Sequence, residues 1–316
     1  MGRKNAGDDK SVARGFGVVV PVDAGRDVGI VIPVYRGRRF LGEALASVAA
    51  QSATISRDVL VVEDGSPEGD TAADIAAAYP GVRYEYWADN RGVFYARCYG
   101  ATRLASTRYL AFLDQDDVWR PEFLTRTVEA LERRPDAPMA VANAEMRTAS
   151  GAYTLYRVGT PEITLDALKW RNTITTPGQV LARRTAFDAA RLEPVLSSPG
   201  ADDWLLWLAL LAVGGDGVYI PEVLLDYREH EGGAHNRVDM RRSERAVVSS
   251  WFPRFVLSSW DARCYGGRVA LDLLREARLE RQPQTALLGA VRALRDPAAF
   301  VAAVRERRRR LTYRRV

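Results

Sequence analysis

The sequence predicts an α/β protein with a mostly parallel central sheet and helices on both faces of that sheet. Two observations carry this prediction. Short apolar or β-branched runs alternate with stretches whose apolar residues recur at helical spacing, and Gly-, Asp- and Asn-rich turns separate them. Such alternation is typical of βαβ units. The expected strands are 28–34, 59–63, 82–87, 109–113 and 138–144, and the expected helices are 40–48, 71–79, 93–106 and 121–134.

The ends of these elements carry recognisable signals. Asp70 or Thr71 is a suitable N-cap for the second helix, and Pro121 suits the first turn of the fourth. After residue 150 the pattern loosens into a strand near 179–184, a helix from Asp202 and a strand at 223–229. Beyond about residue 240 it is helical, at 268–280, 284–294 and 298–308. We therefore expect a flexible leader (1–27), a main domain (28–238, divided into 28–120 and 121–238) and a helical C-terminal appendage (239–316).

Composition narrows the class of protein. The chain has 316 residues, 47% of them hydrophobic and 27% charged, which is typical of a globular protein. Its longest apolar run, at 204–213, is half the length needed to cross a bilayer, and the leader makes a poor secretory signal. Cys98 and Cys264 lie far apart without a CxxC motif, so a reducing compartment, the cytoplasm, is expected.

Positive charge is concentrated at the C-terminus. The net charge is +5, and residues 305–316 contain seven arginines and one glutamate, so the rest of the chain is close to neutral. A run of this kind is most often a solvated terminus, and it can also attract an anionic membrane surface. No nucleic-acid-binding motif accompanies the charge, so no nucleic-acid partner is expected. Peripheral contact with the inner face of the membrane stays open.

Three aspartates follow the fourth expected strand in the segment LDQDDVW. Asp114, Asp116 and Asp117 repel one another unless a cation, a ligand or a shared proton compensates them. Residues two apart in an extended segment project to one side, so Asp114 and Asp116 can face the same ligand. Mg²⁺ or Mn²⁺ with a diphosphate suits such carboxylates. The alternative is a set of turn and helix-cap acids before Pro121.

Four segments in order, IPVYRGRRFLGEALASVAAQS, VVEDGSPEGD, DNRGVFYAR and YLAFLDQDDVWRPEFL, resemble the nucleotide-sugar-binding half of family-2 glycosyltransferases. The resemblance covers roughly residues 28–235 and implies a GT-A fold and an inverting, metal-dependent transfer of sugar from a UDP- or dTDP-sugar. It makes 28–120 the nucleotide-binding half and 121–238 the acceptor half. The sequence departs from the family pattern at Glu63, where a second aspartate is common, and at Cys98, where an amide is common.

The resemblance also implies roles for individual residues. Asp64 would bind the base, Asp114 the ribose, and Asp116 a Mn²⁺ or Mg²⁺ ion that bridges the diphosphate, with Asp114 and His230 of YREH as further metal ligands. Asp117 is extra to the minimal DxD motif. The residues expected to bind the donor are Pro33, Val34, Tyr35, Glu63, Asp64, Gly65, Asn90, Gly92, Arg97, Asp114 and Gln115.

The segment GADDWLLWLALL resembles the family's acidic motif before a helix. An acceptor hydroxyl is a poor nucleophile until a carboxylate takes its proton, so Asp203 is the expected general base. Asp202 would be an N-cap or an acceptor contact, and an N-cap role for the pair is the plainer alternative. Gly-rich EGGAHN (231–236) could form a mobile flap. His230 could also be an incidental surface histidine.

Two other functions remain open from the sequence. LDQDDVW also fits the nucleophile motif of haloacid-dehalogenase-type phosphatases, with Asp114 as nucleophile, although three strand-helix units precede it. A non-catalytic nucleotide-sugar-binding relative is the second alternative, whereas the lack of GxGxxG disfavours a dehydrogenase. The acceptor would be a small molecule, a glycan or a lipid-linked sugar. The Ala- and Arg-rich composition suggests a bacterial source.

Overall fold

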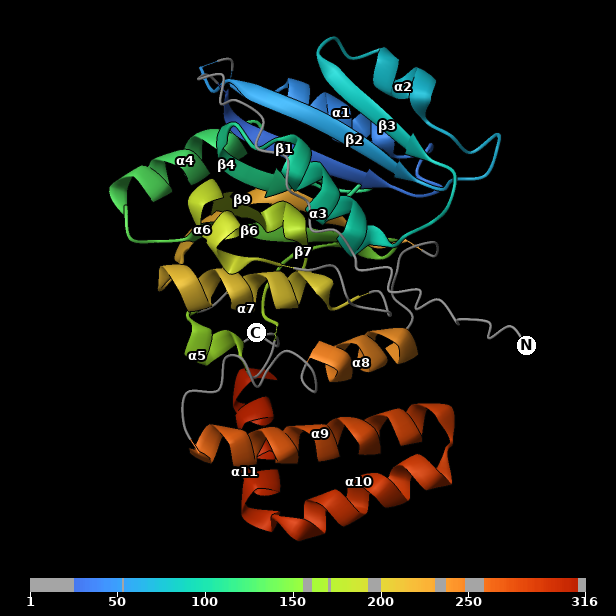
Figure 1. The fold of residues 1–316 in the computed structure, drawn as a ribbon, viewed down its shortest axis with the longest axis vertical. Helices are drawn as coiled ribbons and strands as arrows, with labels where there is room; N and C mark the ends of the chain where they lie inside the picture. Colours follow the sequence, from blue (N-terminus) through green and yellow to red (C-terminus); the bar gives the residue numbers. More distant parts are fainter. Residues whose placement is uncertain are drawn as a thin grey trace, which may run out of the picture.

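The computed structural model describes residues 26–52, 54–155, 161–169, 172–192, 200–230, 237–247 and 259–311. Its centre is a nine-stranded sheet in the order β3-β2-β1-β4-β8-β6-β9-β5, with β7 paired to β6 (Figure 1). The strands are β1 (Arg26–Val34), β2 (Arg57–Asp64), β3 (Val82–Trp87), β4 (Thr107–Phe112), β5 (Val118–Trp119), β6 (Met139–Thr148), β7 (Gly151–Thr154), β8 (Val180–Arg183) and β9 (Val218–Arg228).

Six of these strands run in one direction. β1 pairs in parallel with β2 and β4, β2 pairs in parallel with β3, and β6 pairs in parallel with β9. β8 is inserted antiparallel between β4 and β6, and β5 and β7 are also antiparallel to their neighbours. The predicted mostly parallel sheet is confirmed, and its parallel strands bring their carboxyl ends to one edge, where ligands bind in folds of this kind.

Helices cover both faces of the sheet, as predicted. One face packs against α1 (Leu41–Ala49), α2 (Ala73–Ala77) and α4 (Phe123–Arg133). The other packs against α3 (Val93–Arg103), α6 (Arg184–Ala190) and α7 (Asp202–Gly214), with α5 (Leu165–Leu168) beside α7. These two apolar layers hold the sheet between them, so the edge formed by the carboxyl ends of its parallel strands is supported from both sides.

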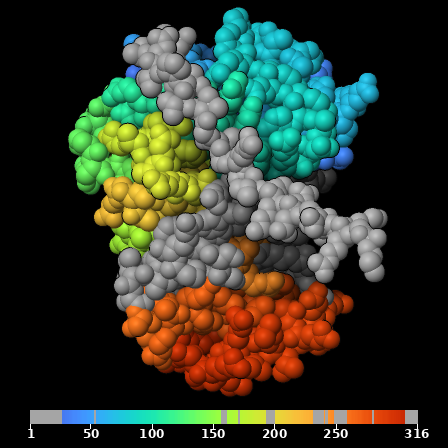
Figure 2. Space-filling view, in the orientation of Figure 1, coloured from blue at the N-terminus to red at the C-terminus, as the bar shows by residue number. Residues whose placement is uncertain are grey.

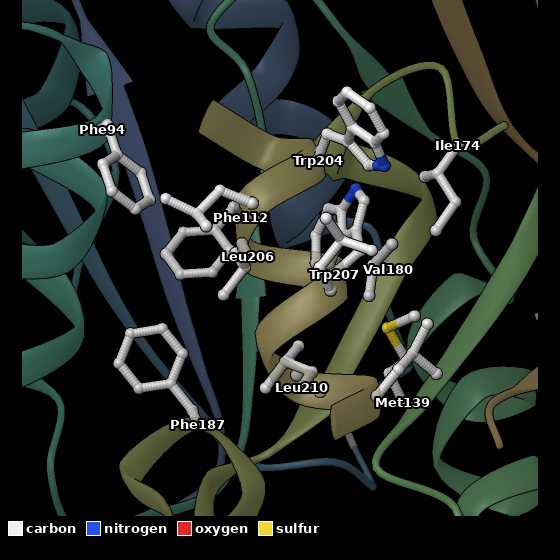
Figure 3. Close-up of a cluster of buried hydrophobic side chains, with 14 of the residues drawn as sticks. Phe94, Phe112, Met139, Ile174, Val180, Phe187, Trp204, Leu206, Trp207 and Leu210 are labelled. Atoms are coloured by element: carbon white, nitrogen blue, oxygen red, sulfur yellow. The ribbon is translucent and has the colours of Figure 1, made fainter. Parts of the chain in front are cut away.

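Most of the apolar segment at 204–213 forms a buried core helix, with Trp204 to Leu211 buried. Trp204, Trp207 and Leu210 of α7 pack among Phe112, Phe187 and their neighbours (Figure 3), and the Trp204 indole donates a hydrogen bond to the Leu168 carbonyl at 2.8 Å. A helix buried on all sides is expected to be apolar all round. Among the described helices, none combines the length and hydropathy needed to cross a membrane.

Two predicted helix starts differ from the structure. The N-cap of α2 is Ala72, and neither Asp70 nor Thr71 caps it; the carboxylate of Glu63 instead accepts a hydrogen bond from the Ala72 N–H at 2.8 Å. Helix α4 begins at Phe123, two residues after Pro121. In the first case a buried acid from a distant strand replaces the local cap, which the local sequence does not reveal.

The C-terminal appendage is helical, as predicted. It comprises α8 (Arg237–Ala246), α9 (Ser259–Glu280), α10 (Pro283–Arg295) and α11 (Pro297–Leu311). Figure 2 shows α9 to α11 as one lobe at the end of the molecule away from the sheet. Residues 1–25 of the expected leader, the expected flap at 231–236 and residues 312–316 of the tail lie outside the described residues, and the chain is already in β1 at Arg26.

Candidate active site

The ends of β1 and β4 are joined by the side chain of Gln115. Its Oε1 accepts a hydrogen bond from the Tyr35 N–H at 2.9 Å, and its Nε2 donates to the Tyr35 carbonyl at 3.1 Å. Gly37 leaves room for this amide, because a Cβ there would lie 2.0 Å from Oε1. The Tyr35 ring is exposed, whereas Pro33 is buried and the side chain of Val34 lies in the core. The Val34 side chain is therefore not accessible to a ligand.

Glu63 faces the interior. Its side chain is fully buried, and Oε2 accepts hydrogen bonds from the Ala72 N–H and from the Tyr84 hydroxyl at 2.6 Å. This carboxylate anchors the start of α2 and does not open onto the edge of the sheet. The expected donor contact through the Glu63 side chain is therefore not supported by its placement.

Asp64 organises the loop between β3 and α3. Its two carboxylate oxygens accept hydrogen bonds from the backbone N–H groups of Arg91, at 2.6 Å, and Gly92, at 2.8 Å, while Asn90 Nδ2 donates to the Asp64 carbonyl at 2.9 Å. Gly65 has a φ of +72°, and a Cβ there would lie 2.4 Å from the Asn90 nitrogen. Four of the expected donor residues are therefore one hydrogen-bonded unit, with Arg91 stacked over Trp87 beside it.

Arg97 lies between the two acidic motifs. Its guanidinium binds Asp114 at the end of β4 with one nitrogen and Asp202 at the start of α7 with the other. The side chain is buried, and although burial alone would lower the pKa of Arg97, the carboxylates of Asp114 and Asp202 raise it. A permanently charged, bidentate group thus links two loops that are 88 residues apart in the sequence.

Asp116 pairs with His230. The distance from His230 Nε2 to Asp116 Oδ2 is 2.8 Å, and the imidazole packs on the Phe40 ring with 4.6 Å between ring centroids. Burial and the neighbouring Asp114 raise the pKa of Asp116, and the hydrogen bond from His230 opposes this. The structure therefore brings together two of the three expected metal ligands.

Asp117 lies inside the protein, with partners different from those of Asp116. It is fully buried, accepts a hydrogen bond from the Thr176 hydroxyl at 2.6 Å and a weaker one from the Arg228 N–H at 3.4 Å. Burial and the charges of Asp114 and Asp116 raise the pKa of Asp117 well above its usual range. Its contacts connect the DQDD loop to the end of β9, two residues before His230.

Asp203 lies in the first turn of α7, beside Asp202. Its Oδ1 accepts hydrogen bonds from the Trp204 N–H at 2.6 Å and Asn172 Nδ2 at 3.2 Å, whereas no hydrogen bond from the described residues reaches Oδ2. Burial and the charge of Asp202 raise the pKa of Asp203 to about 8, and Arg97 opposes this. Sequence reasoning missed Asn172 and Thr176, because neither belongs to a motif and both depend on tertiary contacts.

The described acidic and histidine side chains at this edge do not form a complete metal site by themselves. Among the described residues, no three His, Cys, Asp or Glu side chains form a group that could hold an ion by themselves. Asp114, expected as a third ligand, binds Arg97 through Oδ1, and its role as a metal ligand stays a prediction. Asp116 and His230 fit a cation only where a ligand such as a diphosphate supplies further oxygens, which is the usual way Mg²⁺ is bound.

Comparison with known proteins decides the family. Residues 29–191 match the model of glycosyl transferase family 2. The chain belongs to glycosyl transferase family 2. The match covers more than half of the chain. It identifies the protein as a glycosyltransferase and decides against the phosphatase alternative. The family resemblance expected from the four sequence segments is confirmed.

Relatives and solved structures agree with this assignment. The family-2 chain is 27% identical over 300 residues to the succinoglycan biosynthesis protein ExoO of Rhizobium meliloti, covering 88% of this chain and 84% of ExoO. It is 26% identical over 269 residues to the uncharacterized protein Rv1520 of Mycobacterium tuberculosis, covering 82% and 71%. Residues 1–349 of S. aureus TarS in complex with UDP-GlcNAc share the fold, with a TM-score of 0.61, 16% identity and coverage of 88% and 79%. The predicted GT-A fold is thereby confirmed.

Proposed function

We propose that this glycosyltransferase moves a sugar from a UDP- or dTDP-sugar to an acceptor hydroxyl or amine with inversion at the anomeric carbon, and that Asp203 is the general base. One observation carries the proposal. The buried guanidinium of Arg97 binds both Asp114, at the end of β4, and Asp202, which precedes Asp203. One charged group therefore connects the proposed donor-binding loop with the start of the helix that carries the proposed base.

Asp203 has the properties that a base requires. Its Oδ2 is free to accept a proton, and the raised pKa makes the carboxylate more basic than an ordinary aspartate. As the acceptor oxygen or nitrogen attacks the anomeric carbon, its proton passes to Oδ2. The bond from that carbon to the diphosphate oxygen breaks, and the nucleoside diphosphate leaves with the bonding electron pair. Asn172 and the Trp204 N–H hold Oδ1 and so fix the carboxylate.

Asp116 and His230 are the residues proposed to hold a divalent ion, Mn²⁺ or Mg²⁺. When bound, such an ion supplies positive charge that offsets the charge of the departing diphosphate. The two side chains are adjacent, and the part of the chain that the structure describes offers Asp116 Oδ1 no hydrogen bond from another side chain. Asp117 would keep this pair in place through Thr176 and the Arg228 backbone.

The donor is proposed to bind along the edge from β1 to β3. Exposed Tyr35 and the loop built by Asp64, Gly65, Asn90 and Gly92 lie at the carboxyl ends of adjacent parallel strands, which favours this edge. UDP-GlcNAc in the complex of TarS supports a UDP-type donor. The relative ExoO is a succinoglycan biosynthesis protein, which supports a glycan or lipid-linked acceptor. Two free cysteines among the described residues suit the cytoplasm.

The proposal is tested by incubating the protein with UDP- and dTDP-sugars, Mn²⁺ and a panel of hydroxyl and amine acceptors. We expect nucleoside diphosphate release that depends on acceptor and a product of inverted anomeric configuration by NMR. Retained configuration would exclude this mechanism. Tight donor binding with no turnover across the panel would favour the non-catalytic relative.

A further inference from the structure

Helix α10 carries an exposed apolar face on the C-terminal lobe. Leu287, Val291 and Leu294 recur at spacings of four and three, so they share one side of the helix, and Leu288 borders them. Leu287 is 67% exposed and Leu294 is 77% exposed. Single exposed leucines are ordinary, but four apolar side chains on one side of one short helix form a patch.

The opposite side of α10 explains the direction of this patch. Gly289 is buried, and a Cβ there would lie 2.9 Å from the Leu274 side chain of α9, so this side of α10 faces α9. The leucines therefore point outward from the lobe. Exposed apolar side chains do not help the lobe to fold. No contact within the described part of the chain accounts for their exposure.

The charged residues around the patch indicate what kind of partner it binds. Arg292 and Arg295 lie in the last turn of α10, both are exposed, and the helix contains no acidic residue. The first acid after it, Asp296, is already paired with Arg263 at 2.8 Å. From residue 259 to the C-terminus the chain has fourteen arginines and six acids. An apolar helix face bordered by arginines is typical of helices that lie in the interface of an anionic membrane.

A second copy of the chain fits this surface less well. Two α10 helices packed on each other would bring arginines together with no acid from either helix to offset them. The patch is also distinct from the Arg-rich tail, because α11 runs from α10 back past α9 toward the sheet-bearing part of the molecule in Figure 1. The tail contributes to the overall positive charge but does not form the apolar face.

We infer that the exposed face of α10, formed by Leu287, Leu288, Val291 and Leu294 with Arg292 and Arg295, docks the enzyme on an anionic phospholipid surface. The leucines enter the acyl boundary and the arginines bind lipid phosphates. The inference depends on the lobe alone and does not require the proposed assignment of the base.

The test is sedimentation of the full chain with extruded vesicles of phosphatidylcholine containing about one third phosphatidylglycerol, a composition chosen to be anionic. We expect binding to these vesicles, little binding to pure phosphatidylcholine vesicles, and release as salt is raised toward about 1 M. The variant Leu287→Gln/Leu294→Gln should bind at least about tenfold more weakly, since membrane binding scales with buried apolar area. Arg292→Gln/Arg295→Gln should reduce the preference for anionic vesicles, because it removes the cations that border the apolar face.

Two controls keep the test decisive. Val213→Gln removes another exposed apolar side chain, at the end of α7, and should bind vesicles as the parent does. All variants should keep the parent unfolding midpoint within about 2 °C, because the altered side chains are exposed. Equal binding by Leu287→Gln/Leu294→Gln and the parent would overturn the inference. So would a dimer in analytical ultracentrifugation that this variant dissociates, since a second copy would then be the occupant.

Discussion

Asp203 is the residue on which the proposed chemistry depends most directly. Asp203→Asn keeps the hydrogen bonds to Oδ1 but cannot accept a proton, so kcat should fall by about 10²- to 10⁴-fold while donor affinity is retained. Turnover by the initial-rate assay and donor affinity by calorimetry measure the two effects. Asp216→Asn, which alters an exposed acid beyond α7, is the matched control and should leave both unchanged. Parent-like turnover in Asp203→Asn would exclude this base.

The raised pKa of Asp203 predicts a pH dependence of defined sign. Below a pKa of about 8 the buried carboxyl is mostly protonated in the donor-free enzyme and cannot act as a base. The value of kcat/KM, which reports groups of the free enzyme, should therefore rise with pH and level off above about 8. A profile that is flat between pH 6 and 9 would contradict the assignment.

Arg97 should set the pH at which kcat/KM rises. It is the cation that lowers the pKa of Asp203, against burial and the charges of Asp202 and Asp114. Arg97→Gln should move the rise in kcat/KM to higher pH. Arg97→Lys keeps the charge and should move it less, although an ammonium cannot bind both carboxylates as the guanidinium does. A purely structural role would lower activity without moving the profile. Since the Gln variant leaves buried acids unpaired, its folding is checked by thermal unfolding.

At the scale of elements, the loop between β3 and α3 is held by the turn after β2. Gly65→Ala places a Cβ 2.4 Å from the Asn90 nitrogen, so the loop must shift and the donor KM should rise by about tenfold, the effect of roughly 1.4 kcal/mol. Gly69→Ala is the matched control. Gly69 also has positive φ, at +93°, but nothing lies within 4 Å of its Cβ position, so it tests the backbone strain without the clash. Equal donor KM values for the two variants would argue against the loop as a donor site.

The strands and helices also show how much of the fold and of the candidate site could be predicted from the sequence. The five strands and four helices of the first half were expected because each element has its own period and its own turn residues, and the motifs were expected at the strand ends. The inward placement of Glu63, the pairing of Gln115 with the Tyr35 backbone and the bridge from Arg97 to Asp202 were not. Each of these depends on a partner far away in the sequence, and residue type alone does not choose between partners.

In the molecule as a whole, segments from distant parts of the chain meet at the edge formed by the carboxyl ends of the parallel strands. The functional edge collects side chains from β1, β2, β4, β9, α3 and α7, which come from both expected halves of the main domain. Residues far apart in the chain therefore meet at this edge, where Asp202 binds Arg97 and His230 binds Asp116. Only the first half shows regular strand-helix alternation, so the sequence pattern does not reveal these contacts between the two halves.

Metal and nucleotide binding should be cooperative across that edge. Asp116 and His230 offer too few ligands to hold an ion alone, and Asp114 is bound to Arg97, so oxygens from a diphosphate are needed to complete the coordination. Mn²⁺ alone should hardly change the unfolding midpoint, and UDP alone should raise it slightly. Together they should raise it by several degrees, more than the two separate shifts combined, because a ligand that binds only the folded state stabilises it according to its affinity. In Asp116→Asn the extra shift should disappear while the shift with UDP alone remains. A large shift with Mn²⁺ alone would instead indicate a preformed metal site and would contradict the two-ligand arrangement.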